Sequence, residues 1–196
     1  MLDTHARKYV NPMIDKASKG FLNLKMTPNQ VTVLAFIIGI IASIGVYFNH
    51  NIVACLLLWI SGFLDAVDGA MARTSDNSTL WGTLLDITFD RIVEIFIIIS
   101  LALKFNQLIF NYLILTCCII FSMTIFLTVG ALSEKNGIKS FYYQAGIAER
   151  TEGFIFFTCM ILSPNNTGLI TNIFSILIFI TAIQRMIEAK EIFTKK

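Results

Sequence analysis

Apolar stretches of membrane-spanning length alternate with short polar connections along most of the chain. An α-helix needs about 20 mainly apolar residues to cross the hydrocarbon core of a bilayer. Because the connections are only a few residues long, consecutive helices are expected to be antiparallel neighbours. The fifth stretch is short and becomes apolar only after Glu152. The pattern predicts a bundle of six transmembrane helices, at 31–48, 52–73, 82–103, 107–132, 145–163 and 169–183.

The segment before the first apolar stretch has a different pattern. Basic and apolar residues alternate in residues 1–26, which is typical of an amphipathic helix lying in the headgroup layer. The alternative is a disordered basic tail. Thr27 and Pro28 then form a typical helix start, with a capping residue followed by proline. The predicted division is an interfacial helix at 1–26, a transmembrane domain at 27–190 and a tail at 191–196.

Composition supports an all-α integral membrane protein. Of the 196 residues, 56% are hydrophobic and only 14% are charged, whereas soluble domains carry about 25% charged residues. Lysine and arginine gather at both ends of the chain and in the fourth connection between the predicted spans, and Arg73 stands where the second connection begins. Basic connections favour the cytoplasmic side. We therefore expect an inner-membrane protein with both termini in the cytoplasm, and no nucleic-acid partner.

Four aspartates interrupt the second and third predicted spans. Asp65 and Asp68 lie on one helical face, and Asp86 and Asp90 lie on one face of the next helix. In an antiparallel hairpin, Asp65 is level with Asp90 and Asp68 is level with Asp86. A carboxylate at the centre of a bilayer costs about 2.5–3.5 kcal/mol. Four converging carboxylates near the cytoplasmic end therefore predict a bound cation.

The surroundings of these aspartates favour a hard metal and an anionic substrate. Carboxylates without a nearby His or Cys cluster select Mg²⁺, Mn²⁺ or Ca²⁺, and paired metals are typical of phosphoryl-type transfer. Gly69 and Ala72 leave room for a bulky anion, and Arg73 can bind a phosphate. The alternative is a structural ion-pair network, which would need matching cations. In this part of the chain only Arg73 and Arg91 could supply them.

The spacing of these residues also carries a family resemblance. Intramembrane prenyltransferases hold a diphosphate with aspartates, but they usually carry an Asn-Asp-x-x-Asp run and a distant second run. This chain has Asp-x-x-Asp-Gly-x-x-Ala-Arg, eight residues, then Gly-x-x-x-Asp-x-x-x-Asp. That pattern resembles the CDP-alcohol phosphatidyltransferase family. The matching positions are Asp65, Asp68, Gly69, Ala72, Arg73, Gly82, Asp86 and Asp90.

The resemblance implies a reaction and a role for each residue. A CDP-linked lipid, usually CDP-diacylglycerol, would donate its phosphatidyl group to an alcohol, and CMP would leave. Asp65, Asp68 and Asp86 would hold Mg²⁺ or Mn²⁺, two ions in all. Asp90 would be a shared ligand and the general base. The implied contacts with the CDP-lipid are Gly69, Ala72 and Arg73, and more weakly Pro28, Asn29, Val31 and Thr79. The family also implies a homodimer.

The second half of the chain bears on the acceptor. Glu134-x-x-Gly137 and residues 146–152 resemble the inositol-phosphate branch of the family, although two arginines typical of that branch are missing. Arg150 is retained, and Lys135 and Lys139 are further candidates for binding the acceptor. Inositol phosphate is the preferred acceptor, with glycerol 3-phosphate, serine or another alcohol as alternatives.

Two functions outside the family also remain open. The first is intramembrane prenyl transfer, and the second is divalent cation transport. A carrier should have polar access from both sides of the membrane, whereas the polar residues here cluster in the cytoplasmic half.

Overall fold

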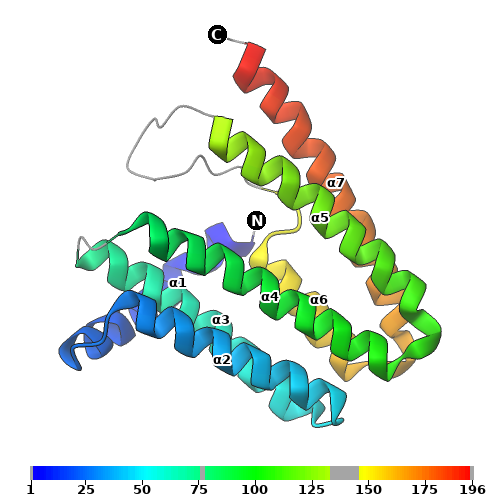
Figure 1. The fold of residues 1–196 in the computed structure, drawn as a ribbon, viewed down its shortest axis with the longest axis horizontal. Helices are drawn as coiled ribbons and strands as arrows, with labels where there is room; N and C mark the ends of the chain where they lie inside the picture. Colours follow the sequence, from blue (N-terminus) through cyan, green and yellow to red (C-terminus); the bar gives the residue numbers. More distant parts are fainter. Residues whose placement is uncertain (1, 76–77, 133–145, 195–196) are drawn as a thin grey trace. The chain divides into compact units, whose positions relative to one another are not determined.

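The computed structural model describes residues 2–75, 78–132 and 146–194, with side chains from residue 10 onward. Within these ranges the protein is helical and contains no strand (Figure 1). The helices are α1 (Leu2–Asn23), α2 (Pro28–Tyr47), α3 (Asn51–Thr74), α4 (Leu80–Lys104), η1 (Asn106–Leu108), α5 (Ile109–Leu132), α6 (Arg150–Leu162), η2 (Pro164–Asn166) and α7 (Thr167–Thr194).

The chain divides into two compact units. The first is Thr4–Asn106, which holds most of α1 and all of α2, α3 and α4. The second is Gln107–Lys196 with Met1–Asp3, and it holds α5, α6 and α7. All four aspartates belong to the first unit, while Arg150 belongs to the second.

The predicted start of α2 is confirmed. Thr27 and Gln30 form a reciprocal capping box: the Gln30 N–H donates to Thr27 Oγ1 at 3.3 Å, and the Thr27 N–H donates to Gln30 Oε1 at 2.9 Å. Pro28 occupies the first helical position, where its missing N–H costs nothing. At the other end of α2, Asn49 has a φ of 64°, a left-handed conformation that asparagine tolerates. This residue lets α3 begin at Asn51 and pack back along α2.

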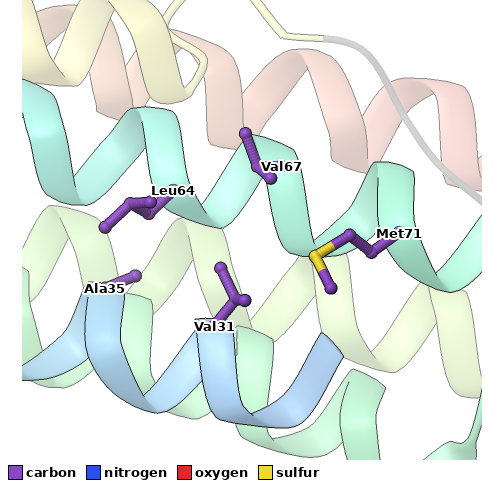
Figure 2. Packing of buried hydrophobic residues seen from close by; sticks show 5 residues of the cluster. All are labelled: Val31, Ala35, Leu64, Val67 and Met71. Carbon is purple, nitrogen blue, oxygen red and sulfur yellow. The ribbon is translucent and has the colours of Figure 1, made fainter. Parts of the chain in front are cut away.

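Apolar side chains join α2, α3 and α1 in one hydrophobic core. Its buried members come from facing stripes of α2 and α3, as Figure 2 shows: Val31, Ala35, Leu64, Val67 and Met71. Side chains of α1 cover this core, namely Ile14, Ala17, Phe21 and Leu22. On other sides of α1, Lys16 and Lys19 are exposed. The N-terminal segment is therefore helical and is anchored by an apolar face.

Helix α2 also packs closely against α4. Gly39 makes this approach possible, because a Cβ at this position would lie 2.6 Å from Val93 Cγ2 and 2.9 Å from Ser61 Oγ. The rings of Phe36 and Phe89 stack across the same interface, with centroids 4.2 Å apart. Ser61 Oγ of α3 donates a buried hydrogen bond of 2.7 Å to the Ala35 carbonyl of α2. Helix α2 thus fixes the positions of both helices that carry the aspartates.

In the second unit, α7 packs against α5 and α6. The Phe174 ring of α7 stacks on Phe156 and meets Phe157 edge-on, and both of these partners lie on α6. Tyr112 of α5 and Thr167 share a buried hydrogen bond of 3.3 Å between their hydroxyls. Helix α7 continues without a break to Thr194. The basic end that the sequence suggested as a tail is therefore largely helical.

Among the residues that the structure describes, four helical segments are long and apolar enough to cross a membrane. They are Pro28–Tyr47, Asn51–Thr74, Asn106–Leu132 and Pro164–Thr194. Helix α4 is long enough, at about 37 Å for its 25 residues, but it carries several charged side chains. Helix α6 has 13 residues and spans only about 20 Å, less than the hydrocarbon core. Six spans therefore remain a prediction.

Candidate functional site

Three of the four aspartates form a compact acidic cluster between α3 and α4. One carboxylate oxygen from each of Asp65, Asp68 and Asp86 lies within 4.8 Å of the other two. Asp65 and Asp68 are 9% and 4% exposed, and Asp86 is half-buried. Carboxylates held this close and this far from water repel one another, and such an arrangement is typical of a cation-binding site.

Asp90 lies beside this cluster. It lines a small cavity together with Asp65, which agrees with the expectation that these two residues lie at the same depth. Ser61 and Thr32 contribute hydroxyl groups to the same cavity, and the stacked Phe36 and Phe89 form part of its apolar wall. Ser61 was not a candidate in the sequence analysis. However, it lies one helical turn before Asp65, so helical periodicity could have indicated it.

The donor set fits a hard divalent cation. Oxygen ligands around an octahedral Mg²⁺ are about 3.0 Å apart when adjacent and about 4.2 Å apart when opposite. The oxygens of Asp65, Asp68 and Asp86 already lie within 4.8 Å of one another, so a small contraction would bring them onto one ion. No nitrogen or sulfur donor belongs to this cluster among the described residues, which favours Mg²⁺ or Mn²⁺ over Zn²⁺.

Arg73 extends the site toward the end of α3. Its guanidinium lies over the face of the helix one turn earlier, because a Cβ at Gly69 would be 3.4 Å from Arg73 Nη1. Arg73 is exposed, and Gly69 and Ala72 are half-buried. The small residues Gly69 and Ala72 leave an open surface on α3, and Arg73 lies beside it. This surface follows the acidic cluster directly in sequence.

The amino-terminal ends of α2 and α4 meet at a second part of the site. A Cβ at Gly82 would lie 3.0 Å from Asn29 Oδ1 and 3.1 Å from Thr79 Oγ1. Thr79 caps α4 by accepting a hydrogen bond of 3.0 Å from the Gly82 N–H. Asn29 and Thr79, two candidate nucleotide contacts, are therefore neighbours of the motif residue Gly82, and Pro28 precedes Asn29 directly.

Val31 differs from the other candidate nucleotide contacts. Its side chain is fully buried in the core formed with Leu64, Val67 and Met71. The observed role of this side chain is to hold the start of α2 against α3. Its role as a nucleotide contact remains a prediction.

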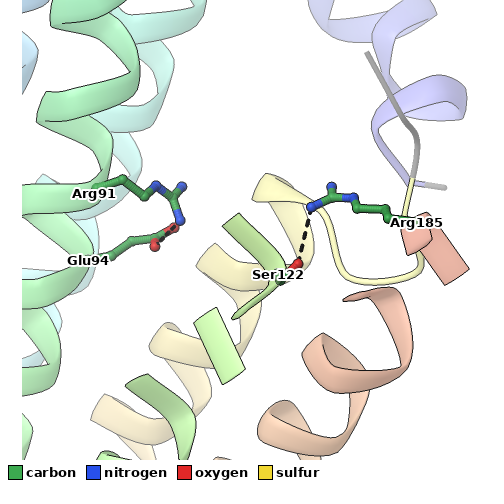
Figure 3. A network of polar contacts seen from close by, with 4 residues as sticks. All are labelled: Arg91, Glu94, Ser122 and Arg185. Carbon is green, nitrogen blue, oxygen red and sulfur yellow. Dashed lines mark hydrogen bonds and ion pairs between the residues drawn. The ribbon is translucent and has the colours of Figure 1, made fainter. Parts of the chain in front are cut away.

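The cations near the aspartates are engaged in different ways. Arg91 forms an ion pair with Glu94, one turn further along α4 (Figure 3). Arg73 is exposed to solvent at the end of α3. A structural network that neutralised the four aspartates would need more positive charge than these two arginines supply, since one of them already shares its charge with Glu94.

The candidates for acceptor binding belong to the second unit. Arg150 is the first residue of α6, is half-buried, and lies over the Phe154 ring at 5.7 Å. Lys135 and Lys139 lie outside the described residues.

The sequence analysis missed Arg185, which is only 8% exposed. It donates a hydrogen bond of 3.2 Å to Ser122 Oγ, drawn in Figure 3, and lies 4.8 Å from the Phe126 ring centroid. Helical periodicity could have indicated that Arg185 is buried, because it continues the buried stripe of α7 that includes Ile178 and Ala182.

Comparison with known proteins agrees with this geometry. The sequence profile of the CDP-alcohol phosphatidyltransferase family matches residues 25–188. An archaetidylinositol phosphate synthase from Pyrococcus horikoshii is 31% identical, over 94% of this chain and 95% of that protein. Inner membrane protein YnjF of Escherichia coli is 28% identical, over 95% of this chain and 94% of that protein.

A solved structure has the same fold. It is the phosphatidylinositol phosphate synthase of Mycobacterium tuberculosis with CDP-DAG bound, with a TM-score of 0.72 and 22% identity over 91% of this chain and 94% of that one. The matched region includes both aspartate helices and extends into α7. This membrane protein belongs to the CDP-alcohol phosphatidyltransferase family of enzymes.

Proposed function

We propose that this enzyme transfers a phosphatidyl group from CDP-diacylglycerol to the hydroxyl of inositol phosphate and releases CMP. The observation that carries the proposal is the acidic cluster of Asp65, Asp68 and Asp86, with Asp90 on the adjoining cavity. In the reaction, the acceptor oxygen forms a bond to the phosphorus joined to the lipid. The bond between that phosphorus and the oxygen bridging to CMP breaks, and CMP leaves with the electron pair.

Asp65, Asp68, Asp86 and Asp90 would hold divalent metal, Mg²⁺ or Mn²⁺, two ions in all. When bound, the metal would supply positive charge that offsets the carboxylates and the diphosphate. The all-oxygen donor set and the separation of the oxygens support this assignment. A manganese complex of the Mycobacterium tuberculosis synthase is also among the structures with this fold.

The CDP part of the donor binds where the ends of three helices come together. Arg73 pairs with the diphosphate, and Gly69 and Ala72 let it approach the surface of α3. Asn29 and Thr79 lie at the amino-terminal ends of α2 and α4, where exposed N–H groups and helix dipoles favour an anion. Pro28 and Val31 shape the start of α2 on this side.

Asp90 acts as the general base. Its carboxylate takes the proton of the acceptor hydroxyl as the oxygen attacks, which requires the carboxylate to be ionised and within hydrogen-bond reach of the acceptor. A position on the cavity wall, half-buried and next to Asp65, supports this role.

The acceptor assignment is supported by the similar proteins. The Pyrococcus horikoshii relative is named an archaetidylinositol phosphate synthase, and the Mycobacterium tuberculosis structure is named a phosphatidylinositol phosphate synthase. A phosphorylated acceptor needs cationic groups, which Arg150 supplies together with Lys135 and Lys139. Glycerol 3-phosphate and serine are the competing acceptors.

The proposed membrane arrangement has six spans, both termini in the cytoplasm and α1 in the headgroup layer. Its support is the excess of lysine and arginine at the two ends of the chain. The nucleotide and the polar acceptor then reach the site from water, while the acyl chains stay in the bilayer. The protein is proposed to act as a homodimer.

The test is CMP release from CDP-diacylglycerol by purified protein, with inositol phosphate, glycerol 3-phosphate and serine as separate acceptors. We expect release that requires divalent metal and is fastest with inositol phosphate. If CMP release were faster with another acceptor, that alcohol would be the acceptor in place of inositol phosphate. Incorporation of label from a prenyl diphosphate, or metal uptake into proteoliposomes without CMP release, would overturn the proposed reaction.

A further inference from the structure

The backbone turn just before α6 is held onto α7 by a hydrogen bond. The Ala148 N–H donates a hydrogen bond of 2.9 Å to Thr181 Oγ1. The Gly146 N–H donates one of 3.0 Å to Glu149 Oε1, which closes the turn on itself. Thr181 is 1% exposed and also donates to the Leu177 carbonyl at 2.9 Å, so its hydroxyl both donates and accepts.

Gly146 lies buried directly against α7. A Cβ at this position would lie 2.4 Å from Thr181 Cγ2 and 3.3 Å from Arg185 Nη2. Only a residue without a side chain lets the backbone come this close. Arg185 in turn is held by Ser122 and the Phe126 ring of α5, so the surface under the turn is itself fixed.

The turn leads straight into Arg150. Glu149 is the N-cap of α6, and its carbonyl accepts the first helical hydrogen bond, 3.0 Å from the Gly153 N–H. Further along α6, contacts with Phe174 fix the helix axis. The two rings on α6 lie one to two turns from Arg150, whereas the turn at 146–149 joins Arg150 directly.

We infer that Thr181 and Gly146 form a latch that positions Arg150 for the acceptor. In this inference Thr181 is a positioning residue, since it acts through the turn at 146–149. The inference rests on the proposed function, because it assumes that Arg150 binds a phosphorylated acceptor. Under this inference, acceptor specificity depends in part on the buried, uncharged hydroxyl of a threonine on α7.

The test compares Thr181→Val with Thr181→Ser, because valine removes the hydroxyl at nearly constant shape and serine retains it. Loss of one hydrogen bond should raise the KM for inositol phosphate about fivefold in Thr181→Val. The KM for CDP-diacylglycerol and kcat should stay within about twofold of the wild type, since neither depends on where Arg150 lies. Thr181→Ser should restore the acceptor KM. Gly146→Ala should raise it further, because the new methyl group must displace the turn.

Thr194→Val is the matched control, because within the described part of the chain Thr194, on the same helix, donates only to the Lys190 carbonyl. Hydrogen–deuterium exchange of peptides covering 146–149 supplies a readout independent of activity. Exchange should be faster in Thr181→Val than in the wild type, Thr181→Ser and Thr194→Val. Unchanged exchange in Thr181→Val would show that no latch exists.

Faster exchange with an unchanged acceptor KM would show that the latch does not position Arg150. Equal changes in both KM values and kcat would mean a general structural role and would also overturn the inference. Failure of the proposed function looks different, since the wild type would then release no CMP with inositol phosphate. In that outcome the positioning role of Thr181 would also be overturned, because Arg150 would have no phosphorylated acceptor to bind.

Discussion

Asn29 at the start of α2 and Gly82 in the first turn of α4 are in close contact, with 3.0 Å between Asn29 Oδ1 and the place of a Gly82 Cβ. The two residues are far apart in sequence. The family resemblance implied Asn29 as a contact with the nucleotide, while Gly82 is one of the positions that match the family pattern. Their contact brings two helix amino termini to the same place, where an anion is favoured.

Gly82→Ala tests this contact. The new methyl group would press on Asn29 and on the Thr79 cap, so we expect weaker binding of the CDP-lipid and a KM raised about tenfold. Gly20→Ala is the control, because a Cβ there meets no atom of the described part of the chain within 4 Å. The measurement is the KM for CDP-diacylglycerol at saturating acceptor. Equal KM values for Gly82→Ala and the wild type would show that the contact between Asn29 and Gly82 is not part of the nucleotide site.

Gly69→Ala separates a ligand effect from a packing effect. Among the described residues, the neighbour of a Cβ at Gly69 is Arg73 Nη1 at 3.4 Å, an ordinary contact distance. The free protein should therefore keep its thermal stability. If the diphosphate approaches the Gly69 surface, the KM for CDP-diacylglycerol should still rise, by about tenfold or more. A wild-type KM would mean that the diphosphate binds elsewhere.

Asp90→Asn and Asp68→Asn should affect different properties of the enzyme, the rate of the chemical step and the metal requirement respectively. Asparagine at position 90 removes the proton acceptor, so we expect kcat to fall by about 10²–10⁴ with little change in nucleotide affinity. Asparagine at position 68 removes a ligand charge from the cluster, so the concentration of Mg²⁺ needed for half-maximal rate should rise as well. Near-native turnover of Asp90→Asn would refute its role as the base.

Periodicity was enough to predict that the aspartates lie close together, because their spacing follows helix geometry. The aspartates recur every three or four residues on two helices joined by a short connection, so their convergence follows from the spacing alone. The first four apolar stretches likewise matched helices within a few residues, since long uncharged runs permit little else. The helix start at Thr27 could also be predicted, because its capping box involves only residues close together in sequence.

The features that were missed depend on tertiary contacts. Arg185 was counted with the basic end of the chain, but the groups that bury it, Ser122 and Phe126, come from a distant helix. The close approach of α2 and α4 at Gly39 depends on Val93, which no local pattern connects with it. Helix α6 begins five residues later than the predicted span, because residues 146–149 form a turn on α7 instead.

Gly39→Ala tests whether the crossing of α2 and α4 supports the site. Its Cβ would lie 2.6 Å from Val93 Cγ2, and such overpacking costs about 1–3 kcal/mol. We expect a lower melting temperature and a lower kcat, since Val93 lies one turn from Asp90. The double variant Gly39→Ala/Val93→Ala should recover both, because the smaller side chain makes room. Failure of the double variant to recover would mean that the close approach is not what holds α4 in position.

Direct measurement of metal binding tests the central claim most sharply. Titration of the purified protein with Mn²⁺, followed by electron paramagnetic resonance, should show saturable binding in the wild type. Arg150→Lys serves as the control and should bind like the wild type. We predict that Asp68→Asn and Asp86→Asn each weaken this binding at least about tenfold. Unchanged Mn²⁺ binding in both aspartate variants would contradict the assignment of the acidic cluster as the metal site.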